Sequence, residues 1–330
     1  MKKTVKKLSK IDQIEIDGKI FKIEFFLGGD LKWLAFCMGI NGANSKFPCP
    51  WCEFQMKKIM KKRDIKKNWS IKGRSLEKAL VCLKKSTINK KKGYKNKPLF
   101  PFIKFYECVV DLLHLTLRIT DKLFSLLIYR LEELDANFSS KLIQVLRDFM
   151  ENECKISNPF QPINKSKNES LKLRKLNQNE RIKLFNELYG KERTLDSIFP
   201  PEFQSHPTIL SLSRLFPNFF EYINKMKKIE NLSLRKKEKL VKKLKNWLKI
   251  FIDIEPKITP YIHIFVFHLP EFLEAYPNIN LFSMQSLEKK NHSVKLNYYF
   301  QTNRKDCFSK ILLQKMNRLD LLRLNEKILN

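Results

Sequence analysis

The sequence predicts an α+β fold in which a few strands near the N-terminus precede a mostly helical chain. Alternation of apolar and polar residues, which is typical of strands, is found before residue 30. Beyond it, apolar residues recur at spacings of three and four, as in amphipathic helices. Hydrophobic residues make up 43% of the 330, including 26 Phe, so the chain can bury a core. The presence of only 8 Gly argues against a many-turned β-sandwich.

The N-terminal segment, residues 11–27, is predicted to form a β-hairpin. Apolar and polar side chains alternate on both sides of Asp17-Gly18, a pair that favours a tight turn. Asp30 then opens a short apolar helix over residues 31–38. A carboxylate at such a junction can cap the helix, and this is the structural role of Asp30 if it has no catalytic one.

The helical part of the chain is predicted from the spacing of its apolar residues. We expect helices over residues 103–134 (one helix or two joined), 138–152, 181–189, 207–227, 231–254 and 305–328. Pro217 is a candidate break in its helix, and the polar stretch 161–180 is predicted to be a linker. Lysines cover one face of the 231–254 helix. That face is either a solvated surface or a phosphate-binding one.

The charge balance points to a polyanionic partner. Lys and Arg number 65 against 34 Asp and Glu, a formal net charge of +31. An AT-rich coding sequence would inflate Lys, but it does not explain why acidic residues fail to keep pace. We therefore expect DNA as partner, with an anionic membrane surface as the lesser alternative. No apolar run is long enough to cross a membrane, and no glycine-rich phosphate loop occurs.

The 7 cysteines, an odd number in a long chain, do not indicate a disulfide framework, and a reducing compartment fits them better. Two of them form Cys49-Pro50-Trp51-Cys52, and two histidines lie at His263-x4-His268. Paired cysteines and paired histidines at these spacings are a common structural Zn²⁺ ligand set. The alternative for the histidines is an apolar segment in which each ring has a backbone partner. Closing the long intervening loop costs entropy that grows only slowly with length.

Two isolated carboxylates stand at similar offsets from this predicted zinc site. Asp30 lies 19 positions before Cys49, and Glu288 lies 20 positions after His268. The zinc closure would bring the two carboxylates together, and paired carboxylates bind Mg²⁺ or Mn²⁺. Glu288 is alternatively an ordinary exposed helix residue. The residues around it suit a DNA backbone: Lys289, Lys290, Asn291, Lys295 and Arg304.

Taken together, these motifs resemble one family, the catalytic subunit of the V(D)J recombinase and the Transib-type transposases. The resemblance extends over most of the chain by short motifs and spacing. The motifs are Gly29-Asp30-Leu31-Lys32, Gly42-Ala43-Asn44-Ser45, Cys49-Pro50-Trp51-Cys52, Leu113-His114, His263-Ile-Phe-Val-Phe-His268-Leu-Pro-Glu271 and Ser286-Leu287-Glu288.

The resemblance implies a partial RNase H-like core of the DDE nuclease type, with a large, mostly helical, zinc-pinned insertion. Residues 1–47 would supply strands and a helix of that core, residues 48–280 the insertion, and residues 281–330 the C-terminal helices. Asp30 would be the second catalytic aspartate and Glu288 the catalytic glutamate, with Cys49, Cys52, His263 and His268 as zinc ligands. The role of His114 stays open. The family also implies a nuclear protein that can act as a homodimer.

One part of the family pattern has no clear counterpart, namely the first catalytic aspartate. Only 29 residues precede Asp30, and within them Asp17 belongs to the predicted turn while Asp12 begins a strand. Two carboxylates rarely hold two ions in working geometry. We therefore expect a DNA-binding protein with an incomplete, weak or inactive nuclease site. The competing expectation is a non-catalytic, zinc-stabilised scaffold that binds nucleic acid or protein.

Overall fold

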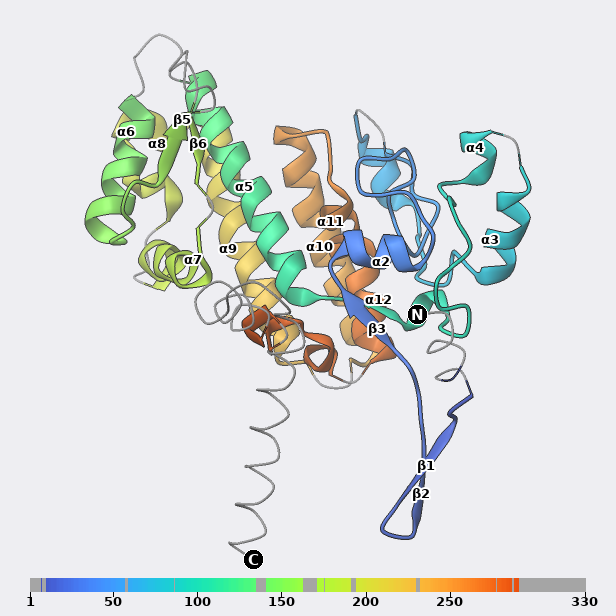
Figure 1. Ribbon diagram of the computed structural model, residues 1–330. Helices are drawn as coiled ribbons and strands as arrows, with labels where there is room; N and C mark the ends of the chain where they lie inside the picture. The colour runs from blue at the N-terminus through green and yellow to red at the C-terminus, as the bar shows by residue number, and fades with distance from the viewer. Residues whose placement is uncertain are drawn as a thin grey trace, which may run out of the picture. The chain divides into compact units, whose positions relative to one another are not determined.

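The computed structural model confirms a mixed α+β fold, and the order of its elements can be followed in Figure 1. It describes residues 7, 10–56, 59–85, 87–134, 141–162, 171–174, 176–190, 194–229, 232–276, 278–286 and 288–290. The chain divides into a compact unit, Met1–Phe282, and a second unit, Ser283–Asn330. Whether an RNase H-like core and the three predicted segments exist stays a prediction, and the predicted helix 305–328 lies outside the described residues.

The predicted N-terminal hairpin is present. Strands β1 (Gln13–Ile16) and β2 (Lys19–Lys22) pair antiparallel. Asp17 and Gly18 between them have φ values of 50° and 71°. Positive φ at both central residues is the type I′ turn that matches the twist of a hairpin. Both strands are exposed along their whole length.

A short parallel sheet joins two segments that are distant in sequence. Strand β3 (Leu27–Gly29) pairs with β4 (Cys108–Val110), and helix α2 (Leu31–Cys37) follows β3 as expected. The prediction of helix from residue 103 is wrong in its first part, because α5 begins only at Leu112 and runs to Leu134. Residues 105–107 form the 3-10 turn η2 instead. The β-branched, fully buried Val109 and Val110 favour the strand, whose partner is distant in sequence.

The remaining elements are mostly helices. Those before α5 are η1 (Lys62–Lys66), α3 (Leu76–Leu83) and α4 (Ile88–Lys91). Those after it are α6 (Lys141–Asp148), η3 (Phe149–Glu153), α7 (Gln178–Phe185), η4 (Asn186–Gly190), η5 (Leu195–Ile198), α8 (Pro201–Gln204), α9 (Pro207–Lys227), α10 (Leu234–Ile254), α11 (Pro260–His263), η6 (Ile264–His268), α12 (Leu269–Ala275) and η7 (Ile279–Phe282). None of the described helices combines the length and apolar content needed to cross a bilayer.

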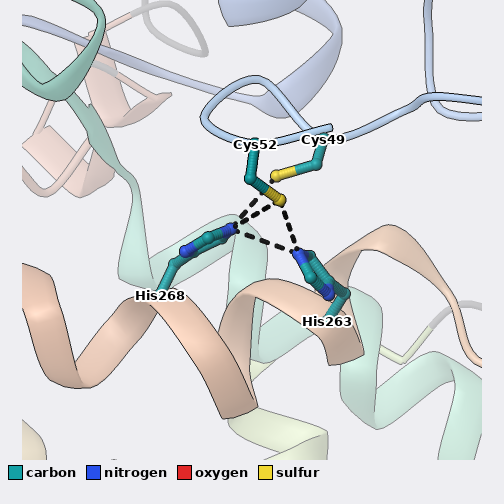
Figure 2. A group of neighbouring side chains, drawn as sticks. All are labelled: Cys49, Cys52, His263 and His268. Carbon is teal, nitrogen blue, oxygen red and sulfur yellow. Dashed lines mark hydrogen bonds between the residues drawn. The ribbon is translucent and has the colours of Figure 1, made fainter. Parts of the chain in front are cut away.

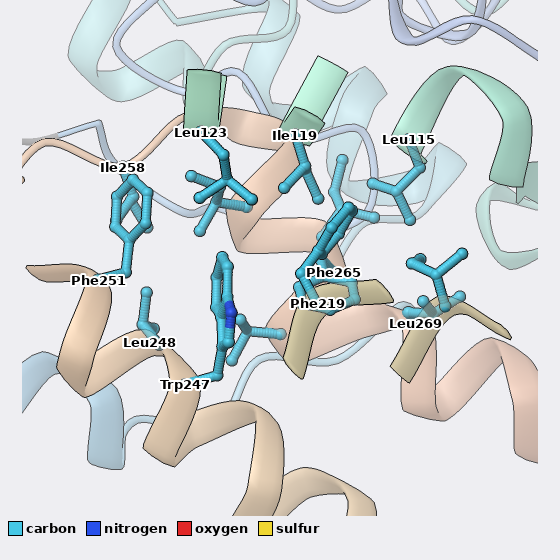
Figure 3. Packing of buried hydrophobic residues seen from close by; sticks show 14 of the residues in the cluster. Leu115, Ile119, Leu123, Phe219, Trp247, Leu248, Phe251, Ile258, Phe265 and Leu269 are labelled. Carbon is cyan, nitrogen blue, oxygen red and sulfur yellow. The ribbon is translucent and has the colours of Figure 1, made fainter. Parts of the chain in front are cut away.

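The core of the first unit is formed by the apolar faces of α5, α9 and α10, together with the segment carrying the two histidines (Figure 3). Trp247 is at its centre, and its indole N–H donates to the carbonyl of Leu215 at 2.9 Å. Phe219 and Phe265 pack edge-on with centroids 5.1 Å apart. Burial of such large rings supplies most of the driving force for folding here. Pro217 does not break α9, since the buried Phe216 and Phe219 on either side hold the helix in the core.

The predicted linker 161–180 is partly ordered as regular structure. Strands β5 (Phe160–Pro162) and β6 (Leu171–Leu173) pair antiparallel. Helix α7 begins after Asn177, whose side chain accepts from the N–H of Glu180 at 2.9 Å. The Glu180 carboxylate in turn accepts two hydrogen bonds from the guanidinium of Arg174, at 2.6 and 3.0 Å. Polar residues that indicated a linker therefore cap a helix and form an ion pair.

Candidate metal centre

Four side chains from opposite ends of the first unit converge on one buried point (Figure 2). The sulfur of Cys52 lies 3.2 Å from Nε2 of His263, and the sulfur of Cys49 lies 3.3 Å from Nε2 of His268. The two Nε2 atoms are 3.1 Å apart, and all four ligand atoms lie within 4.8 Å of one another. None of the four residues is more than 2% exposed. The cysteine pair and the histidine pair, which are distant in sequence, therefore meet as predicted.

The geometry of this group suits a tetrahedral metal ion. Zinc–sulfur bonds of about 2.3 Å and zinc–nitrogen bonds of about 2.05 Å give tetrahedral edges of about 3.6 Å between S and N and about 3.3 Å between N and N. The observed separations of 3.1 to 3.3 Å are slightly shorter. A small outward movement of the side chains would open the space for the ion. Two thiolates and two imidazoles are ligands of the kind zinc prefers, so the group can hold a metal such as zinc.

The cysteine loop is held by a buried arginine. Nε of Arg74 donates to the carbonyls of Cys49 and Cys52, each at 3.0 Å, and Nη1 donates to the carbonyl of Lys92 at 2.8 Å. Arg74 is 1% exposed, and its guanidinium lies over the ring of Tyr94, 4.7 Å from the centroid. The indole N–H of Trp51 donates to the carbonyl of Cys108 in β4 at 2.7 Å. These contacts aim both sulfurs in one direction.

The histidines share a face because the helix widens between them. In an α-helix, residues five apart are about 140° apart around the axis, so one ring would point away from the cysteines. Here residues Ile264–His268 form a π-helical turn, η6, closed by a hydrogen bond from the N–H of Leu269 to the carbonyl of Ile264. Bonding to the fifth residue places His263 and His268 about one turn apart. The x4 spacing therefore requires this local distortion.

Aromatic side chains surround the four ligands. Phe54 stacks on the ring of His263 with centroids 4.0 Å apart, and Trp51 meets His268 edge-on. The Nδ1 atoms of both histidines are buried, and no hydrogen-bond partner lies within reach among the described residues. A carboxylate oxygen of Glu271 lies 3.7 Å from Nδ1 of His268 and accepts the N–H of Ile71 at 2.6 Å. Glu271 thus links the histidine segment to the loop after η1.

The electrostatics of the metal-free group favour one thiolate beside one imidazolium. Burial alone would raise the pKa of the Cys49 thiol, but hydrogen bonding from Cys52 and the charge of His268 hold it well below its usual value. Burial and the neighbouring Cys49 raise the pKa of Cys52. Burial lowers the pKa of His263 to about 4. For His268, the Cys49 thiolate outweighs burial and raises the pKa to about 9. Divalent cations displace protons from such groups.

Asp30 is connected to the metal-site segment. It caps α2, accepting the N–H of Lys32 at 3.4 Å, and it also accepts the hydroxyl of Tyr261 at 2.7 Å. Tyr261 lies two residues before His263 in the same helical segment. Burial and this hydrogen bond to Asp30 raise the pKa of Tyr261. The contacts that join the early and late parts of the first unit's sequence therefore include the candidate catalytic Asp30.

Glu288 belongs to the second unit, so its predicted proximity to Asp30 stays a prediction. It lies in a short helical stretch, exposed, with its N–H donating to the carbonyl of Met284 at 2.8 Å. Lys289 and Lys290 are helical and exposed in the same stretch. The other three predicted DNA-contacting residues, Asn291, Lys295 and Arg304, lie outside the described residues.

His114 is bound to a carboxylate that the sequence analysis missed. Its Nδ1 is hydrogen-bonded to Asp111, whose oxygens also accept the N–H groups of Leu113 and His114 at 3.1 and 3.2 Å. Asp111 directly follows β4, as Asp30 follows β3. Because β3 and β4 are parallel, the two carboxylates lie at the same edge of the sheet. The β-branched pair Val109-Val110 before Asp111 favours a strand and could have indicated this position. It was overlooked because the segment was predicted to be helical.

Comparison with known proteins adds no family assignment. No protein-family model matches this chain, and a search of the curated proteins found no match. What the protein does must therefore be inferred from its own geometry and charge.

Proposed function

We propose that this chain is a zinc-stabilised DNA-binding protein of the DDE recombinase type, with Asp30 and Glu288 as carboxylates of an incomplete nuclease site. The observation that carries this proposal is the meeting of Cys49 and Cys52 with His263 and His268, at the spacings for which the resemblance was stated. A nuclear location and a homodimeric assembly belong to the same proposal.

In this proposal the four buried ligands hold Zn²⁺, which supplies structural stability and no reaction chemistry. Residues next to the zinc ligands connect this stabilised site to the candidate catalytic carboxylate. Tyr261, carried beside His263, holds the carboxylate of Asp30 at the end of β3. The formal charge of +31 supports DNA as the partner, because phosphate contacts from Lys and Arg supply most of the affinity in such complexes.

A second candidate is a non-catalytic scaffold, and a specific observation favours it. Asp30 caps α2 and accepts the Tyr261 hydroxyl, while Asp111 caps α5 and binds His114. Both carboxylates at this sheet edge thus already have structural partners. These partners account for both carboxylates without a metal ion. The scaffold would use the same zinc site to stabilise a surface that binds nucleic acid or protein.

The first test is the zinc content of the purified chain, measured by mass spectrometry under non-denaturing conditions. We expect one zinc per chain, and loss of it in His263→Ala. His206→Ala is the matched control, because His206 caps α9 away from the cysteines and accepts the N–H of Thr208. Zinc retained in His263→Ala at full stoichiometry would remove the basis of the proposal.

The second test separates the two candidates by activity on duplex DNA in the presence of Mg²⁺ or Mn²⁺. Nicking that is abolished in both Asp30→Asn and Glu288→Gln, with DNA affinity unchanged, supports the nuclease. The nuclease candidate requires detectable nicking, however slow, whereas DNA binding without any cleavage in the unaltered chain supports the scaffold. Absence of any DNA binding at low salt contradicts the nuclease and a nucleic-acid-binding scaffold, and leaves a protein-binding scaffold.

A further inference from the structure

A basic groove of about 910 Å³ lies between η1 and the lysine-bearing face of α10. Its lining comes from two segments far apart in sequence. The residues are Lys62, Arg63, Ile65 and Lys66 from η1, and Leu234, Lys237, Glu238, Val241, Lys242, Lys245, Asn246 and Lys249 from α10. Seven of these side chains are cationic and one is a carboxylate. The groove lies entirely within the first unit.

Most of these cations have no acidic partner. Lys62 pairs with Asp253 at 2.9 Å, and Lys237 pairs with Glu274. For the other five, Arg63, Lys66, Lys242, Lys245 and Lys249, no carboxylate of the described chain lies within ion-pair distance. Uncompensated positive charge along one groove repels itself, which lowers the stability of the folded state unless an anion binds.

The two walls of the groove are fixed to the core. Opposite its lysines, α10 buries Leu244, Trp247, Leu248 and Phe251. On the other wall, Ile65 of η1 is 2% exposed. The N–H of Met60, just before η1, donates to the carbonyl of Pro256, just after α10, at 2.8 Å. The cationic side chains are therefore presented from a preformed surface, which limits the ordering cost of binding.

The groove also continues toward the metal centre. Lys237, Val241 and Lys245 line a neighbouring hollow of about 320 Å³ together with Phe267 and Glu271. Nζ of Lys245 lies 6.0 Å from the ring centroid of Phe267, the residue before His268. The basic wall thus adjoins the segment that carries the histidine ligands.

We propose that this groove binds the sugar–phosphate backbone of duplex DNA. The inference rests on the proposed function and names the surface that carries it. From Leu234 to Lys249 the helix rises about 22 Å at about 1.5 Å per residue. One strand of B-DNA rises about 3.4 Å per phosphate along the helix axis but winds around that axis, so a straight groove of this length faces about three or four of its phosphates. A small anion would leave most of the cations unpaired.

The lining favours a duplex over a single strand. Groove-lining residues described in the structure include no aromatic side chain, whereas proteins that hold single strands stack bases on aromatic rings. The apolar contribution comes from Ile65, Leu234 and Val241, which suits the sugars of a backbone more than exposed bases. Binding is expected to read phosphates and not sequence.

The test uses pairs of substitutions on the two walls and a matched control. Lys242→Gln with Lys249→Gln alters one wall, and Arg63→Gln with Lys66→Gln alters the other. The control is Lys236→Gln with Lys243→Gln, which has the same seven-residue spacing on the same helix but lines a different hollow. All six side chains are exposed. Glutamine has nearly the helix propensity of lysine, so α10 should remain folded.

Affinity for a duplex without a defined sequence is measured by fluorescence anisotropy over a range of salt concentrations, alongside melting temperature and zinc content. Each groove pair should reduce the slope of log K against log salt by about 2, roughly one for each phosphate that is no longer neutralised, and the control pair by less than about 0.5. Equal reductions in all three pairs would overturn the groove while leaving DNA binding in place. Tighter binding of a single strand than of the duplex would overturn the choice of ligand. A wild-type chain that binds no DNA would overturn the proposed function as well.

Discussion

Replacing Arg74 by methionine should destabilise the metal centre from outside its ligand set. Methionine fills much of the same buried volume but cannot donate the hydrogen bonds to the carbonyls of Cys49, Cys52 and Lys92. A buried acceptor left without a donor costs about 1–3 kcal/mol, so three acceptors could cost about 3–9 kcal/mol. Because the loop can relax, we expect a loss near the lower end, about 3–5 kcal/mol.

The effect is measured by thermal unfolding of the zinc-loaded protein and by competition with a chromophoric chelator. For a unit of this size, about 2–4 °C is lost per kcal/mol, so the melting temperature should fall by about 6–20 °C. Since Arg74 positions the two carbonyls that orient the cysteine sulfurs, zinc affinity should fall by about 10–100-fold, as for other outer-shell partners.

The control is Arg235→Met, the same substitution at an exposed position in the first turn of α10. It should change stability by less than about 0.5 kcal/mol. If Arg74→Met lowered the melting temperature by less than about 2 °C, the carbonyl contacts would be energetically unimportant and the reasoning would be refuted.

Three further predictions follow from the same contacts. Removing zinc with a strong chelator should lower the melting temperature by about 10 °C, because an ion that binds only the folded state stabilises it by about 4 kcal/mol when present at about a thousand times its Kd; an unchanged melting temperature would contradict the four-ligand site. Tyr261→Phe removes the hydroxyl that Asp30 accepts and should cost about 1 kcal/mol in urea denaturation, with zinc content unchanged; no loss of stability would make that contact unimportant. The hydrogen bonds from Arg174 lower the pKa of Glu180 below 4.5, so its contribution to stability is complete above that pH and is lost as the pH falls below it. Glu180→Gln should therefore be destabilised relative to wild type at about pH 7, and in thermal unfolding this deficit should shrink as the pH falls below 4.5; a deficit that did not change with pH would contradict the ion pair.

Some parts of this protein could be predicted because the relevant signal is local. Asp17-Gly18 between alternating residues specified the turn of the hairpin. The three-and-four spacing of apolar residues between 231 and 254 located α10 to within a few residues. The four metal ligands were recognisable because zinc accepts few residue types at few spacings, and this chemistry is readable in a sequence even when the partners are distant.

Other features depended on residues far apart in the chain. Strand β4 exists because β3 lies beside it, although its own segment carries a helix-like pattern. Pro217 is tolerated within α9 because tertiary packing holds its neighbours. The π-helical turn between the histidines brings both rings to the cysteines, at a spacing that an ordinary helix would turn apart.

The contacts of Arg74 and Tyr261 and the position of Asp111 belong to the same class. Arg74 and Tyr261 donate to partners that distant segments place. Asp111 has local hydrogen bonds, but it lies at the same end of the sheet as Asp30 only because β3 pairs with β4. Composition and periodicity report how a stretch of backbone prefers to fold and which face it buries. They do not report which carbonyl or carboxylate will face a buried donor, because that depends on packing among all the elements at once.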